Sequence, residues 1–177
     1  MKAGKLLTII AASIAVVSIL LGLIAPQYFG WYRIEGYTGD SLVVGLYTTG
    51  FGTIVTMPPG YVPFQIMNLT LVSGIVLIIG AILCINGALV EKRTLINIGG
   101  ILIIITPLLS LIDVQLVSGN FYINVLDILG GPEFGTLIWG SYTIGPGSVL
   151  IWGIWIGAFI AFGAGILALV GAGLKLK

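Results

Sequence analysis

The sequence predicts an all-α membrane protein: a bundle of four transmembrane helices that carries a small antiparallel β-sheet on its extracytoplasmic side. Hydrophobic residues make up 58% of the 177 positions and charged residues only 7%, and the mean hydropathy is +1.19. Water-soluble domains do not have this composition. Four apolar runs are long enough to cross a bilayer. The two longer segments between them are rich in aromatic and β-branched residues, which favour strands.

The four apolar runs are predicted to be the spans of a single membrane domain. A crossing takes roughly 20 residues, and the runs cover 6–25, 66–90, 95–112 and 149–173. The longer connections then form outer loops at 26–65 and 114–148. The first run follows MKAGK, which looks like the start of a secretory signal, but it exceeds the roughly 7–15 residues of a signal core. We therefore expect a retained first span.

The distribution of basic residues predicts the orientation, because Lys and Arg collect on the cytoplasmic side of a membrane. Six of the seven basic residues fall on one side of the four-span arrangement: Lys2, Lys5, Lys92, Arg93, Lys175 and Lys177. With Glu91 that side sums to +5. The other side carries Arg33 against five acidic residues and sums to −4: Glu35, Asp40, Asp113, Asp127 and Glu133. We expect a protein of the cell membrane with both termini in the cytoplasm.

The outer loops are predicted to form the sheet. Residues 28–35, 41–48 and 53–57 read as a three-stranded meander with Gly-containing turns, and 133–144 reads as a strand that could join it. Residues 120–129 fit either a helix or a strand. The sheet is either a cap packed on the helix ends or a surface that binds another protein or another copy. Its sparse charge would also suit acidic surroundings, such as those of an acidophilic archaeon.

The fourth span carries the strongest local pattern in the chain. Small residues recur every four positions at Gly153, Gly157, Ala161 and Gly165. Small residues at this spacing let two helices approach closely in lipid. The partner is either the first or third span of the same chain, or a span of another subunit.

The residue types argue against catalysis and bound cofactors. Histidine is absent and Cys84 is the single cysteine, which removes the usual ligands of haem, zinc and copper and any Ser-His-Asp set. A net charge of +1 offers no basic surface for nucleic acid. We expect no enzyme, no metal and no cofactor. Asp113, at the outer end of the third span, is the candidate polar site; it is expected to reach water or Arg33, and a proton relay would need acidic partners at depth.

The first outer loop resembles that of the claudin and peripheral-myelin-protein superfamily. The family pattern is a Trp, then Gly-Leu-Trp, two residues, a Cys and a later Cys. Here Trp31 precedes Gly45-Leu46-Tyr47, and Gly50 and Gly60 stand where the family has its cysteines. The resemblance implies a left-handed four-helix bundle with an outer sheet through which molecules meet side by side or across cells. The outer-loop contact candidates are Trp31, Arg33, Gly45, Leu46 and Tyr47.

These observations favour a non-catalytic role in assembly. The chain would be a structural or accessory subunit that packs in the bilayer against other membrane proteins or against itself, through its fourth span and outer sheet. One alternative is a small oligomeric channel or transporter lined by Asp113, Ser110 and Thr106. Another is an accessory subunit of a respiratory complex that contributes no ligands itself.

Overall fold

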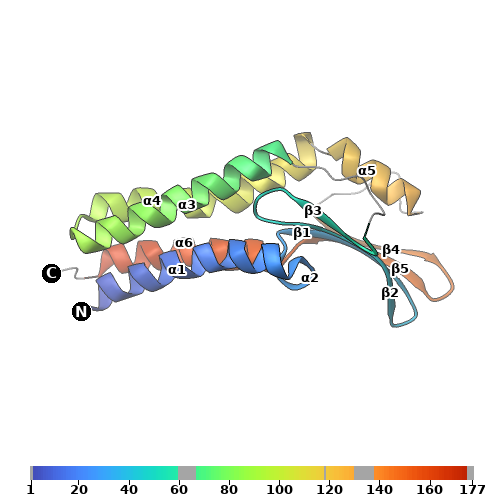
Figure 1. Cartoon of the computed structure of the whole chain (residues 1–177), viewed down its shortest axis with the longest axis horizontal. Helices are drawn as coiled ribbons and strands as arrows, with labels where there is room; N and C mark the ends of the chain where they lie inside the picture. Colours follow the sequence, from blue (N-terminus) through green and yellow to red (C-terminus); the bar gives the residue numbers. More distant parts are fainter. Residues whose placement is uncertain (1, 60–66, 118, 130–137, 175–177) are drawn as a thin grey trace.

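In a computed structural model, the chain forms a bundle of long helices with a β-sheet at one end (Figure 1). The structure describes residues 2–59, 67–117, 119–129 and 138–174. The helices are α1 (Ala3–Ile24), α2 (Pro26–Phe29), α3 (Asn68–Leu89), α4 (Arg93–Ile112) with a π-helical extension (Asp113–Val117), α5 (Gly119–Ile128) and α6 (Ile156–Gly173). The strands are β1 (Tyr32–Thr38), β2 (Ser41–Thr48), β3 (Ile54–Met57), β4 (Trp139–Gly145) and β5 (Ser148–Ile154). The start of α1 and the end of α6 lie together, at the end of the bundle away from the sheet.

Four helices, α1, α3, α4 and α6, are long and apolar enough to cross a membrane. Three of the predicted spans match α1, α3 and α4 to within a few residues; residue 66, where the second was expected to begin, lies outside the described residues. The predicted start of the fourth span at Val149 is wrong. Residues 148–154 form β5, and the helix begins at Ile156. The run is apolar throughout, so hydropathy alone does not separate a buried strand from the helix that follows it.

Small residues set the spacing of the helices. Neighbouring helices pack in the ring α1, α3, α4, α6 and back to α1. Gly80 of α3 lies against Gly99 of α4, and Gly165 of α6 lies against the carbonyl of Gly100 of α4. Alanines fill much of the bundle core, with larger residues such as Leu77 and Ile103 between them. The bundle therefore holds together by close backbone approach, as is typical of helices in lipid.

The sheet joins strands from both long connections between the helices, with strand order β3-β2-β1-β5-β4 and antiparallel pairing throughout. The predicted meander is confirmed as β1, β2 and β3, although Tyr28 and Phe29 belong to α2. The predicted strand at 133–144 appears as β4 from Trp139 onward, and 133–137 lie outside the described residues. The ambiguous segment after α4 is the helix α5.

The sheet is anchored directly to the bundle. The amide of Trp155 donates to the carbonyl of Trp31 (2.9 Å), and the amide of Gly157 donates to the carbonyl of Gly30 (3.0 Å). The indole of Trp155 donates to the carbonyl of Gln27 (2.9 Å). These bonds tie the start of β1 to the start of α6, so the sheet continues the bundle without a flexible linker. Helix α5 lies over one face of the sheet (Figure 1) and, with the end of the bundle, closes a second hydrophobic core.

Candidate functional site

The junction between the bundle and the sheet contains a buried carboxylate, Asp113. It lies where α4 passes into the π-helical turn, and its exposed fraction is 0%. Its Oδ2 accepts hydrogen bonds from the backbone amide and from the hydroxyl of Thr70, both at 2.7 Å. A buried charge is tolerated only when such partners replace its lost hydration.

Asp113 caps helix α3 from the neighbouring helix. Thr70 is the third residue of α3, and the residue before the helix, Met67, provides no side-chain cap. The first amides of a helix have no partner within the helix, and the positive end of the helix dipole attracts a negative charge. The Asp113 carboxylate meets both needs. It thereby fixes the end of α3 nearest the sheet to that of α4.

The expectation that Asp113 reaches water or Arg33 is wrong. The carboxylate points into the protein, and Arg33 forms its ion pair with Glu35 instead. Two hydroxyl residues of α4 near Asp113 are also buried: Thr106 donates to the carbonyl of Ile103 (2.8 Å), and the Ser110 hydroxyl lies 3.4 Å from that of Thr70. The polar candidates of α4 are therefore engaged in contacts within and between the helices.

A pair of buried tyrosines lies between this junction and the sheet. The Tyr122 hydroxyl of α5 is 2.6 Å from the hydroxyl of Thr48 on β2. The rings of Tyr122 and Tyr32 meet edge to face, with centroids 4.8 Å apart. Burial raises the pKa of Tyr122 well above its ordinary value; the nearby Asp113 raises it further, and the bond to Thr48 opposes the rise. Burial also raises the pKa of Tyr32 above its ordinary value, so both phenols are neutral at physiological pH and contribute by packing.

A second carboxylate, Glu35, organises the opposite face of the sheet. It is 4% exposed. It accepts hydrogen bonds from Arg33 (2.5 Å), Tyr47 (2.8 Å) and Tyr37 (3.1 Å). The Arg33 guanidinium also stacks on the Trp155 ring, 3.3 Å from its centroid. Burial, followed by the bond to Glu35 and its negative charge, raises the pKa of Tyr47 above its ordinary value. The cluster is neutral overall and joins β1, β2 and the start of α6.

Gly45 is part of this cluster because it has no side chain. It pairs with Glu35 across the two strands, and the Tyr47 ring lies over it to reach Glu35. A Cβ at Gly45 would stand 2.7 Å from Tyr47, a distance that real side chains do not adopt. Packing of the Tyr47 ring therefore explains why a glycine stands at position 45 of the Gly45-Leu46-Tyr47 pattern.

The predicted outer-loop contact residues do not form an exposed surface. Trp31 is 2% exposed and packs in the core of the bundle, and Leu46 is 2% exposed beneath α5. Tyr47 is 1% exposed, Gly45 is buried, and Arg33 is mostly covered. An aromatic and apolar sequence in a loop is compatible with either a contact surface or a core, and here it forms the core.

The small residues of the fourth helix also face inward. Gly157 lies against the carbonyls of Phe29 and Gly30, and Gly165 against α4. Ala161 is fully buried, as are most of the other small residues of α6. Gly153 is not on this helix: it lies in β5 with a φ of 150°, and the Trp139 ring covers the place of its missing side chain. The sequence left open whether this face of α6 packs against the same chain or against another subunit. In the structure it packs against the same chain.

Strand β4 was predicted as a strand, but its position at an exposed edge of the sheet was not. It is an edge strand, seven residues long, without a charge or a proline. Tyr142 is 42% exposed and Ile144 is 45% exposed. The absence of charge over 138–145 is visible in the sequence. The exposure of strand β4, however, depends on the order in which the strands pair.

Comparison with protein-family models and with curated proteins finds no match. The resemblance to claudins therefore remains a prediction based on the first-loop residues. Within the described ranges, no three Cys, Asp or Glu side chains come together as a metal site would require.

Proposed function

We propose that this chain is a multi-pass protein of the cell membrane, with both termini in the cytoplasm and the sheet outside. Four helices of sufficient length and hydropathy support the insertion. The described basic residues Lys2, Lys5, Lys92 and Arg93 lie at or beside helix ends remote from the sheet, where cytoplasmic charges are expected.

Within the membrane, the proposed role is non-catalytic assembly, as a structural or accessory subunit. The buried charged groups at the junction and in the sheet support this role, because the protein uses them for its own architecture. Asp113 caps α3, and Glu35 holds Arg33 and Tyr47. The sheet is hydrogen-bonded directly to the helices, which suits a surface that positions a partner.

The uncharged edge of β4 is the observation that carries this proposal. Soluble sheets protect their edges with charges, prolines or short strands. The other edge follows this rule, because β3 has four residues and leads into Pro58 and Pro59. Strand β4 does not follow it, and in the described part of the chain β5 is its only strand partner. An exposed apolar strand of this kind is a typical protein contact.

Two measurements test the proposal. Cysteines introduced at Asp40 and Lys92 in a Cys84→Ala background should react with a membrane-impermeant thiol reagent in intact cells at position 40 only. The native mass in mild detergent, with partners identified by mass spectrometry, should exceed that of one chain. Labelling at position 92 alone would overturn the orientation, and a strictly monomeric protein would overturn the assembly role.

The hydroxyls of Thr106, Ser110 and Thr70 around Asp113 support a second candidate, a small channel or transporter. Thr70 and Ser110 bring hydroxyls close to the buried Asp113 between α3 and α4, and a channel or transporter needs polar groups of this kind within its spans. Asp113→Asn should then change ion flux in liposomes. The assembly role requires no flux in either protein.

A further inference from the structure

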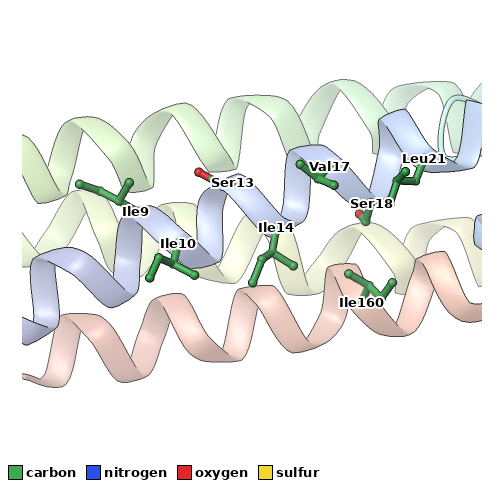
Figure 2. Close-up of a pocket in the computed structure, with 8 residues that line it drawn as sticks. All are labelled: Ile9, Ile10, Ser13, Ile14, Val17, Ser18, Leu21 and Ile160. Atoms are coloured by element: carbon green, nitrogen blue, oxygen red, sulfur yellow. The ribbon is translucent and has the colours of Figure 1, made fainter.

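The outer surface of α1 and α6 is apolar up to the junction with the sheet. Between the two helices it forms a groove of about 420 Å³, lined mostly by isoleucines of α1 and by Ile160 of α6 (Figure 2). Toward the sheet the apolar surface continues with Ile24, which is 80% exposed, and Phe159, which is 59% exposed. The sequence has no charged residue over 6–32 or over 138–174. The apolar surface therefore runs past the ends of both helices into the base of the sheet.

Helix α6 is too short to cross the hydrocarbon layer of a bilayer by itself. Its 18 residues span about 27 Å, whereas the layer is roughly 30 Å thick, and any tilt increases the shortfall. The end of the helix remote from the sheet lies at the level of the basic residues, because Arg93 donates to the carbonyl of Leu174 (3.4 Å). The missing length therefore belongs to the sheet end, where Ile154 and Trp155 precede the helix.

Trp139 lies at this level of the molecule. It begins β4 and pairs with Gly153 near the end of β5, and the amide of Ile154 donates to the carbonyl of Ile138 just before it (3.1 Å). The Trp139 ring covers Gly153, yet 55% of the residue is exposed. The large ring is therefore held in place on one side and open to the surroundings on the other.

Tyr28 lies at the same level on the short helix α2. The indole of Trp155, the residue before α6, donates to the carbonyl of Gln27 (2.9 Å), which precedes Tyr28. The tyrosine is 61% exposed. Trp and Tyr are enriched where a membrane meets water, because each ring is apolar but has one polar end.

We propose that the base of the sheet binds the lipid headgroup layer of the outer leaflet, with Trp139 and Tyr28 as its anchors. The contact continues the apolar surface of the spans and supplies the length that α6 lacks. This inference rests on the proposed membrane position and adds a lipid-binding surface outside the helices. Strand β4 then rises from the membrane surface with Trp139 at its foot, so a partner that pairs with its edge has to lie close to the membrane.

Fluorescence quenching by brominated lipids tests the contact. In vesicles of phosphatidylcholine with bromine on the acyl chains close to the headgroup, the parent protein should be quenched, and Trp139→Phe should lose most of that quenching. The other tryptophans are shielded, because Trp31 and Trp152 are 2% and 3% exposed and Trp155 is partly covered. A phenylalanine ring still covers Gly153, so the variant should keep its fold. Unchanged quenching in Trp139→Phe would overturn the inference.

Two tyrosine positions in the Trp139→Phe background locate the membrane boundary. Tyr28→Trp should restore the quenching, whereas Tyr142→Trp, about 10 Å further along β4, should not. Both tyrosines are exposed, so exposure alone does not separate them, and equal quenching at the two positions would contradict the proposed level. Labelling at Asp40→Cys and Lys92→Cys distinguishes the failures. Correct labelling without quenching of Trp139 removes only the lipid contact, whereas labelling at position 92 alone removes the orientation on which it rests.

Discussion

The carboxylate of Asp113, on the π-helical turn that follows α4, caps the third residue of α3, Thr70, through both its amide and its hydroxyl at 2.7 Å. This cap comes from another helix, whereas helix caps usually come from the residue that precedes the helix. Because Asp113 lies at the end of α4 and begins the π-helical turn that follows it, one side chain joins this end of α4 to the start of α3.

Asp113→Ala should therefore destabilise the whole protein. The loss of a cap costs about 1 kcal/mol, and each buried donor left without an acceptor costs roughly 1–3 kcal/mol more. Asp113→Asn should cost less, because the amide oxygen still accepts. Thermal unfolding in detergent measures both changes. Asp127→Asn, an exposed acidic residue on α5, is the control and should leave the transition unchanged; an unaltered transition in Asp113→Ala would disprove the capping role.

The tyrosines of the sheet predict a loss of stability at alkaline pH. Burial and the Glu35 carboxylate raise the pKa of Tyr47 above its ordinary value of 10.0. A raised pKa means that the unfolded state releases the proton first. The contribution to stability is therefore complete below pH 10 and is lost as the pH rises above it. Thermal unfolding in detergent at increasing alkaline pH measures the loss of stability, and tyrosinate absorbance follows the ionisation that causes it.

Variants assign that alkaline effect to Glu35. Glu35→Gln removes the negative charge and should bring the pKa of Tyr47 closer to its ordinary value. Tyr47→Phe should remove one high-pH titration step. Identical titrations in the Glu35→Gln and parent proteins would contradict the role given to the carboxylate.

The parts of the fold that could be predicted are those that depend on local sequence. Hydropathy predicted four long helices because an uninterrupted apolar run of sufficient length indicates a span without reference to the rest of the chain. Alternation and turn residues predicted β1, β2 and β3 for the same reason. The start of α6 was missed because the residues of β5, Val149–Ile154, are as apolar as those of the helix that follows, so hydropathy does not separate the two.

The roles of individual residues were harder to predict, because they depend on contacts between distant segments. The partner of Asp113 lies 43 positions away in Thr70, and nothing near either residue indicates the pairing. Trp31 and Leu46 stand in a loop by sequence but lie in two separate cores. Exposure, which separates a contact surface from a core, becomes visible only once the strands are paired.

A charge on β4 should abolish partner binding without unfolding the protein. The Thr143 side chain is exposed on β4, and Lys on an edge strand opposes pairing with another strand. Thr143→Lys should therefore lower the native mass in mild detergent while stability changes by no more than about 0.5 kcal/mol. Leu42→Lys places the same charge on an exposed position of β2 and should keep the partner. Loss of the partner in both variants would point to net charge as the cause.

Substitutions of two nearby glycines on α6 should separate internal packing from contacts with lipid. A Cβ at Gly165 would stand 2.6 Å from the Ile104 side chain and 3.0 Å from the carbonyl of Gly100, whereas a Cβ at Gly163 would meet nothing within 4 Å. Gly165→Ala should destabilise the bundle by about 1–3 kcal/mol, the usual cost of overpacking. Gly163→Ala should be neutral or stabilising, because alanine has the higher helix propensity. Since Gly165 packs within one chain, its substitution should lower the unfolding temperature of the monomer. If the substitution changed only the native mass, this face of α6 would instead be a contact between subunits.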